Sequence, residues 1–131
     1  MDNICFTVEE LEGMLPEIAF LIDEAMTVQD ELKEVSMASI TVKSTSSNDK
    51  LMSVSKKERK LRVLNQDILD IIEEIEDLGG IVRDLDNGVV DFPGEFEGKE
   101  IYFCWQAGED HIWYWHEKDS GDRKRIMRLG E

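Results

Sequence analysis

Residues 101–117 hold the densest apolar pattern in the chain, and this pattern limits the folds that the chain can adopt. They read Ile-Tyr-Phe-Cys-Trp-Gln-Ala-Gly-Glu-Asp-His-Ile-Trp-Tyr-Trp-His-Glu, two aromatic runs around a polar loop with one glycine. Such a pattern predicts a β-hairpin. All three tryptophans, both tyrosines and both histidines lie in it. Because successive strand residues point to opposite faces, both faces of this hairpin are apolar and each needs a cover.

The chain has 131 residues, which fits a single domain (residues 1–131) with a modest core. No apolar run approaches the roughly 20 residues that span a membrane, and the first residues do not resemble a signal peptide. We therefore expect a cytoplasmic protein without a membrane partner. Its two cysteines, Cys5 and Cys104, are then expected to be reduced thiols, because disulfides are rare in the cytosol.

The net charge of −15 comes from fifteen basic and thirty acidic residues. A phosphate backbone would repel such a chain, so we expect no nucleic-acid partner. The charge is uneven: residues 1–40 carry −9, whereas residues 56–62 hold five bases and one acid, and residues 122–128 hold four bases and one acid. These segments are either solvated faces or partners of one another.

Two helices are predicted before residue 80. Residues 7–10, Thr-Val-Glu-Glu, form a capping box, but Pro16 disfavours helix at the residue before it, so we expect a break or kink at 15–16. Apolar residues at helical spacing over 18–35 predict a long amphipathic helix. Leucines and isoleucines over 61–78 alternate spacings of three and four, as in a coiled coil, and end at Gly79-Gly80.

The two helices are expected to form an antiparallel hairpin over residues 7–79, joined by a serine-rich, flexible linker at 36–55. This arrangement brings acids near residue 31 beside bases near residue 60. At the other end of the hairpin acids would meet acids, so a cation is needed there. The basic tail at 118–131 is one candidate for that cation, and a bound metal ion is another.

After Gly80 the apolar period changes to two, which predicts an antiparallel sheet over residues 81–117. We expect four strands, at 81–85, 89–93, 100–105 and 112–116, with the second strand ended by Pro93-Gly94. A bulge at Gly88 would place Arg83 opposite Asp91. Pairing Trp105 with Ile112 would place Tyr114 and His116 on the helix-facing side of the sheet. The opposite face would then carry Ile81, Leu85, Val89, Tyr102, Cys104, Trp113, Trp115 and Glu117, with Arg83 and Asp91.

The predicted fold class is therefore α+β, a long coiled-coil-like helical hairpin packed on a four-stranded antiparallel sheet. The residues Val90-Asp91-Phe92-Pro93, Cys104-Trp105, Gly108-Glu109 and Trp115-His116-Glu117, followed by Gly121, resemble a family of short prokaryotic proteins of unknown function. That family is domain of unknown function twenty-two-zero-three. The residues Phe6-Thr7-Val8-Glu9-Glu10 and Leu15-Pro16 also fit its pattern, so the resemblance covers nearly the whole chain apart from 36–55. The family has no established activity, so the resemblance implies no reaction, ligand or catalytic residue.

Few polar residues of the sheet offer chemistry. Asp91 lies in an apolar strand and needs a partner, which is either Arg83 as a structural ion pair or a divalent ion. The alternative site would combine Asp91, Glu109, His116 and Glu117, through oxygen and imidazole ligands. Cys104 lies between two aromatic residues and is expected to be an unreactive, buried thiol.

Two functions remain open at this stage. The first is a structural or protein-interaction module, a homodimer that self-associates through the aromatic sheet face with Trp113, Trp115 and Tyr102. The second is a metal- or small-molecule-binding protein, including a hydrolase-like enzyme, with its site at Asp91, Glu109, His116 and Glu117. No catalytic motif can be read from the sequence, so it favours a non-enzymatic role without a cofactor.

Overall fold

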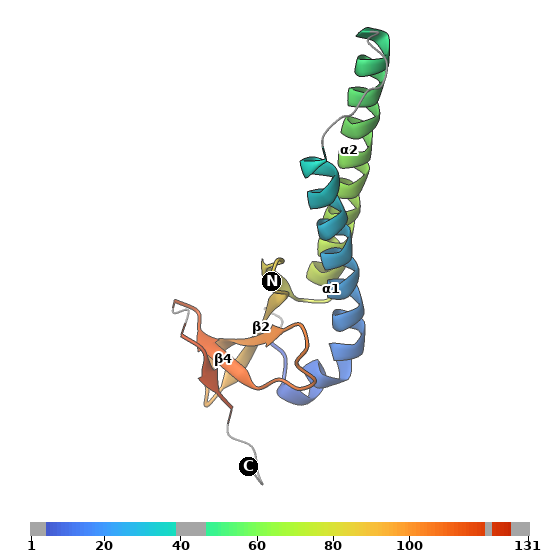
Figure 1. Cartoon of the computed structure of the whole chain (residues 1–131). Helices are drawn as coiled ribbons and strands as arrows, with labels where there is room; N and C mark the ends of the chain where they lie inside the picture. The colour runs from blue at the N-terminus through green and yellow to red at the C-terminus, as the bar shows by residue number, and fades with distance from the viewer. Residues whose placement is uncertain (1–4, 39–46, 120–121, 127–131) are drawn as a thin grey trace.

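The structure is a computed structural model that describes residues 5–38, 47–119 and 122–126. Two long helices, α1 (Val8–Met37) and α2 (Ser47–Asp77), precede an antiparallel sheet. Its strands, which have the same order in the chain and in the sheet, are β1 (Ile81–Asp84), β2 (Val89–Phe96), β3 (Lys99–Gln106), β4 (Tyr114–Glu117) and β5 (Lys124–Arg125). The helices form a stalk, and the sheet lies beside one end of it (Figure 1). The α+β class is confirmed, with five strands instead of the predicted four.

The N-terminus of α1 has the predicted capping box. The Thr7 hydroxyl accepts from the Glu10 backbone N–H at 3.1 Å, and the Glu10 carboxylate accepts from the Thr7 N–H at 3.0 Å. Two of the backbone donors at the helix start are thereby satisfied.

Of the break or kink predicted at residues 15–16, the break is absent, because α1 continues through Pro16. Leu15 and Ile18 are buried on either side of the proline, and the apolar area that they remove from water outweighs the hydrogen bond that proline lacks. The first turns of α1 nevertheless lie at an angle to the rest of the helix (Figure 1).

The prediction of a linker over 36–55 is wrong at both of its ends. α1 continues to Met37, α2 already begins at Ser47, and only residues 39–46 lie outside the described part of the chain. Serine costs less than about 0.7 kcal/mol in a helix, too little to stop one that is continued by good helix formers. As a result α2 projects beyond the end of α1 (Figure 1).

The two helices are antiparallel, as predicted. Lys60 Nζ lies 3.5 Å from Glu31 Oε1, and Lys57 donates to the Ala38 carbonyl at 2.9 Å. These contacts join the end of α1 to the first half of α2. In the part of the chain that the structure describes, no helix is long and apolar enough to cross a membrane.

The core lies between the stalk and one face of the sheet. α1 contributes most of the helical residues, while α2 reaches the core through Ile71 and Ile75. The sheet contributes large side chains that are at most 1% exposed: Val90, Phe92, Ile101, Phe103 and Trp105. These five belong to the face that the period-two pattern assigns to the core.

β2 does not end at Pro93, contrary to prediction, but runs on to Phe96 opposite β3. The Pro93 carbonyl accepts from the Phe6 N–H at 2.9 Å, on the side of β2 that faces away from β3. The missing proline N–H therefore removes no bond from the ladder with β3. Gly94 is needed next to it, because a Cβ there would lie 2.2 Å from the Phe103 ring.

A bulge is present between β1 and β2, as predicted, but it lies at Arg83 and not at Gly88. Val82 pairs with Val90 and Asp84 pairs with Val89, so Arg83 is the extra residue of the bulge. Ile81, not Arg83, lies opposite Asp91.

The predicted pairing of Trp105 with Ile112 is wrong by one register step. β3 and β4 pair Cys104 with Tyr114 and Phe103 with Trp115. A shift of one residue moves every side chain of a strand to the other face. Trp115 therefore joins the helix-facing side, whereas Tyr114 and His116 lie on the open face, which we define as the face carrying Asp91, Tyr102, Cys104, Tyr114 and His116.

Candidate functional site

The open face of the sheet holds a buried ionic pair. Asp91 is 2% exposed and His116 is 9% exposed, and their atoms Oδ2 and Nε2 lie 2.8 Å apart. Asp91 comes from β2 and His116 from β4, so the pair spans β3. Arg83 Nε donates to the same carboxylate oxygen at 3.0 Å, so the ion pair expected between Arg83 and Asp91 is present.

Each ring nitrogen of His116 has a hydrogen-bond partner. Its Nδ1 lies 2.8 Å from the backbone carbonyl of Glu117, and its Nε2 faces the Asp91 carboxylate. A backbone carbonyl only accepts, so Nδ1 is the donor of that bond, and the Asp91 carboxylate accepts from the Arg83 guanidinium. The Nε2 atom of the same ring and the Arg83 guanidinium therefore meet at one buried oxygen of Asp91, Oδ2.

Cys104 is the third buried member of this group. Burial, followed by the nearby negative charge of Asp91, raises the pKa of the Cys104 thiol to about 11. At neutral pH the sulfur is therefore a protonated thiol, which is a poor nucleophile. The structure agrees with an unreactive Cys104, although His116 lies on the same face as Cys104 and not on the opposite one.

The four residues of the alternative metal or ligand site are only partly brought together. Asp91 and His116 meet, but Glu117 points to the other face, where it lies 3.0 Å from Lys99 Nζ and 3.7 Å from Lys124 Nζ. The hydrogen bond and charge of Lys99 hold the pKa of Glu117 below its ordinary value. Among the residues that the structure describes, no group of three or more His, Cys, Asp or Glu side chains is arranged to hold a metal ion.

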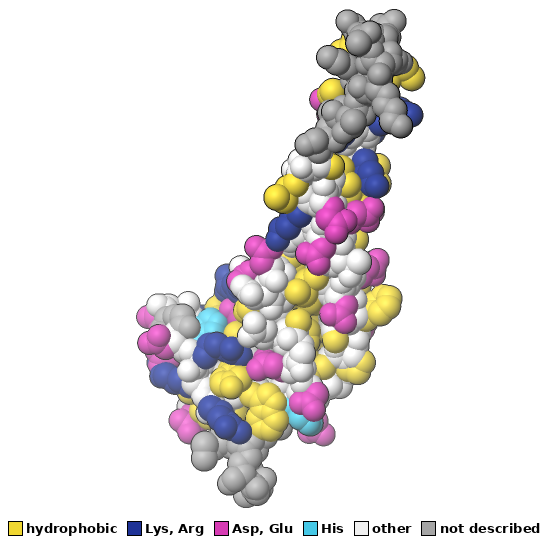
Figure 2. Space-filling model, in the orientation of Figure 1, with side chains coloured by type: hydrophobic (Ala, Val, Ile, Leu, Met, Phe, Trp, Pro, Cys, Tyr) yellow, Lys and Arg dark blue, Asp and Glu magenta, His cyan; other side chains and the backbone are white. Residues whose placement is uncertain are grey.

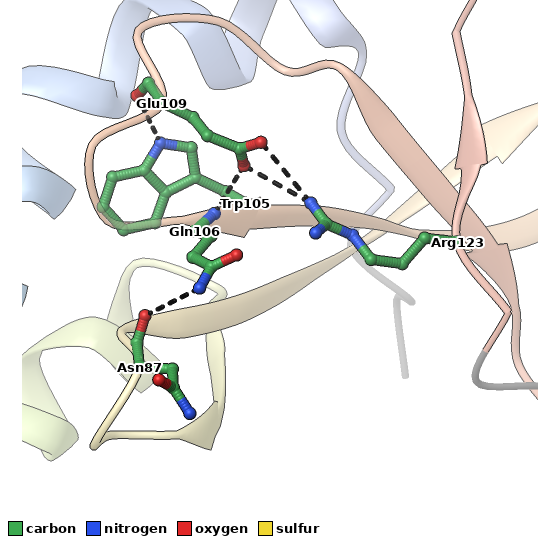
Figure 3. Close-up of polar contacts among 5 residues, drawn as sticks. All are labelled: Asn87, Trp105, Gln106, Glu109 and Arg123. Carbon is green, nitrogen blue, oxygen red and sulfur yellow. Dashed lines mark hydrogen bonds and ion pairs between the residues drawn. The ribbon is translucent and has the colours of Figure 1, made fainter.

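Glu109 has a structural position in the loop after β3 (Figure 3). Its carboxylate accepts from the Gln106 backbone N–H at 2.7 Å, and its carbonyl accepts from the Trp105 indole N–H at 2.8 Å. Arg123 lies 3.5 Å from both carboxylate oxygens, and Gln106 also donates to the Asn87 carbonyl at 3.3 Å. Glu109 therefore ties the loop to both the sheet and the basic tail.

Cations of the basic tail and of β1 cover aromatic side chains of the sheet, including the three that the sequence suggests as a dimer interface. In each case a cation lies over a ring, and the contact is attractive because the ring face carries negative charge. The distances to the ring centroids are 4.0 Å for Arg123 over Tyr114, 4.9 Å for Lys124 over Trp115, 5.4 Å for Arg125 over Trp113 and 5.1 Å for Arg83 over Tyr102. Sequence reasoning directs the tail to the acidic end of the stalk and so misses these contacts. The sequence contains one signal for these contacts, namely that three consecutive bases at 123–125 can each contact one of the three consecutive aromatic residues at 113–115.

The exposed apolar area lies on the stalk. All large hydrophobic side chains that are more than about a third exposed, among the described residues, belong to α1 or α2: Phe20, Met37, Leu51, Met52, Val54, Val63 and Leu69. Hydrophobic side chains reach the surface of the stalk between acidic ones (Figure 2). A groove of about 420 Å³ runs between the helices there, lined by Phe20, Leu21, Glu24, Val28, Asp67, Asp70, Ile71 and Glu74.

These features define an α+β protein with an antiparallel helical stalk and a five-stranded meander whose outer face is ionic and aromatic. The chain belongs to the family of uncharacterised conserved proteins known as domain of unknown function 2203, whose family pattern matches residues 5–126. That assignment confirms the resemblance read from the sequence. No curated protein and no solved structure matches the chain significantly.

Proposed function

We propose that this protein is a self-associating interaction module, and that it associates through its helical stalk and not through its sheet. One observation carries the proposal, namely that the large exposed hydrophobic side chains of the described residues all lie on α1 and α2. Phe20, which lines the groove, is 68% exposed. Val63 precedes the groove residue Asp67 by one turn of α2 and is 60% exposed. Apolar area of this kind, next to charged side chains, marks a protein-binding surface.

The sheet is the weaker candidate. Trp115 is half-buried between Phe96, at 4.9 Å between ring centroids, and Lys124. Trp113 lies against His111, 5.4 Å away, and beneath Arg125. Their rings are therefore already shielded by the chain itself, which reduces the free energy that a partner could gain by covering them.

Light scattering coupled to size exclusion tests the proposal on the full chain. The monomer is 15.1 kDa, so a dimer has a mass of about 30 kDa. We expect that dimer at micromolar concentration and a shift toward monomer in Phe20→Ser. The matched variant Tyr102→Ser on the open face should keep the wild-type mass.

Far-UV circular dichroism should be used to check that each variant remains folded. A wild-type mass of 15 kDa at every concentration would overturn self-association. A dimer that survives Phe20→Ser but dissociates in Tyr102→Ser would place the interface on the sheet instead.

A further inference from the structure

Charge is distributed along α2 in two blocks. Residues 56–62 hold five bases and one acid, whereas residues 67–77 hold six acids and no base. The acidic block also lies beside the acidic N-terminal half of α1, and its position near the helix C-terminus is electrostatically unfavourable. A cation should therefore lie beside it.

The chain itself does not supply that cation within the described residues. The tail bases Arg123, Lys124 and Arg125 contact Glu109, Glu117 and the aromatic rings instead. No salt bridge involves the acids of 67–77 in the part of the chain that the structure describes, nor does one involve Lys56 or Arg59. Lys57 and Lys60 of the basic block contact the end of α1, and Asp70 accepts from Gln66 within α2. Lys56 and Arg59, together with the carboxylates of the acidic block, remain available to form ion pairs with a partner.

One face of α2 carries both blocks. Met52, Lys56, Arg59, Val63, Asp67, Asp70 and Glu74 follow one another at spacings of three or four, so they lie along one side of the helix. Each of them is exposed, and Asp67, Asp70 and Glu74 line the groove beside Phe20. We call these seven residues the α2 seam. Val63 is at its centre, with bases on one side and acids on the other.

We propose that two copies of this chain pair through their α2 seams in antiparallel orientation, with the two-fold axis at Val63. This inference rests on the proposed self-association and specifies its geometry. The two Val63 side chains then face each other, Arg59 faces Asp67 of the second copy, and Lys56 faces Asp70 of the second copy. Met52 of each copy is placed at the groove that holds Phe20 and Glu74. A parallel pair would instead set base against base and acid against acid.

The antiparallel pair also has a closed symmetry. Each copy uses the same patch, so the association ends at two molecules. The sheets lie at opposite ends of the paired stalks, because the sheet lies beside only one end of each stalk (Figure 1).

Exchanging the basic and acidic residues of the α2 seam within one chain tests whether the pair is antiparallel or parallel. Lys56→Glu with Arg59→Glu makes the whole seam acidic, and we expect the dimer to weaken at least about 100-fold, since close charge pairs at interfaces couple strongly. Adding Asp67→Lys and Asp70→Lys to the same chain restores opposite charges in the antiparallel pair, and we expect the dimer to return. Failure of the fourfold exchange to restore a dimer that the double variant has lost would overturn the antiparallel pairing.

Spin-label distances give an independent measurement. In a Cys5→Ser background, where the remaining Cys104 is buried, labels at Val63→Cys should be in near contact across the dimer. Labels at Glu74→Cys should be about 33 Å apart, because 22 residues of helix at 1.5 Å each separate them along the axis. Short distances at both positions would indicate a parallel pair and would reject the inference while leaving self-association intact.

Leu69 supplies the matched control, because it is 59% exposed like Val63 but lies outside the seam. Val63→Glu should dissociate the dimer and Leu69→Glu should not. The reverse result would move the interface to the other flank of α2 and overturn the seam. A monomeric wild-type protein would overturn the proposed function itself, so the two failures are distinguishable.

Discussion

His116 Nε2 lies 2.8 Å from Asp91 Oδ2, although β3 separates the strands that carry the two residues. Cys104 of β3 is the residue paired with Asp91, and Tyr102 is the residue paired with His116. The buried pair thus links three strands through side chains in addition to the backbone ladder. Because both side chains are buried, a substitution that removes one of them leaves the other without this partner.

We predict that Asp91→Asn lowers the free energy of unfolding by about 1–3 kcal/mol, because it leaves the buried His116 ring and the Arg83 guanidinium without the carboxylate that they contact. Urea denaturation followed by circular dichroism gives this value. The control Asp86→Asn removes an exposed contact with Lys33 and should leave the midpoint unchanged. Equal effects of the two substitutions would show that the buried pair has no special weight.

Replacing both Asp91 and His116 by leucine should cost less than the sum of the two single leucine substitutions. Each single change leaves one buried polar side chain without this partner, whereas the double change removes both side chains. A double-mutant cycle in urea measures the difference. Additive costs would argue that the two groups are not coupled.

The two cysteines should differ in reactivity. Cys5 is exposed and should react with a disulfide reagent at pH 8, whereas Cys104 is buried with a pKa of about 11 and should react only after unfolding. We expect one reactive thiol per native chain and two in urea. Two fast thiols in the native chain would contradict the burial of Cys104.

Because of the same pKa shift, the free energy of unfolding should depend on pH in the alkaline range. The Cys104 pKa is about 11 in the folded protein against 9.0 for the free thiol, so the folded state binds this proton more tightly. The associated stability is complete below pH 9 and is lost as the pH rises through 11. The unfolding midpoint of Cys104→Ala should change less between pH 9 and pH 11 than the midpoint of the wild type does. Identical slopes would show that another group titrates there.

Two glycines should respond in opposite directions to alanine. Gly94→Ala places a Cβ 2.2 Å from the Phe103 ring and should destabilise the protein by about 1–3 kcal/mol or more. Gly13 lies inside α1, where an added Cβ would meet no atom within 4 Å, so Gly13→Ala should stabilise by roughly 0.5–1 kcal/mol. Thermal unfolding of both variants measures the contrast. A shift of the same sign in both would count against the close contact at Gly94.

Periodicity in the sequence was sufficient to predict the helices, their antiparallel pairing and the core face of β2 and β3. The register of β4 could not be predicted, because it depends on a contact with a distant residue. The Ile112 backbone N–H donates to the Glu12 carboxylate of α1 at 2.9 Å, and this bond takes Ile112 out of the sheet ladder. The strand then begins at Tyr114, and every later side chain has the face opposite to the one expected.

The prediction of the candidate site depended on the register of β4. Asp91 and Arg83 belong to strands whose faces were predicted correctly, so their ion pair could be anticipated. His116 was assigned to the wrong face, and its contact with Asp91 was therefore missed. β5 is only two residues long and has no apolar alternation, so periodicity does not predict it, and the run of three bases at 123–125 was the one sign that its cations lie over aromatic rings.

The edge strands of the sheet determine whether two molecules can pair strand to strand. β1 is short and bulged, β5 consists of Lys124 and Arg125, and Phe6 occupies the part of β2 that β1 leaves unpaired. Within the described residues, neither margin offers a long, flat row of free amides to another chain, and natural proteins prevent strand-by-strand aggregation in this way. Crowded solutions of this protein should therefore resist fibril growth, and assembly should stop at a small defined particle.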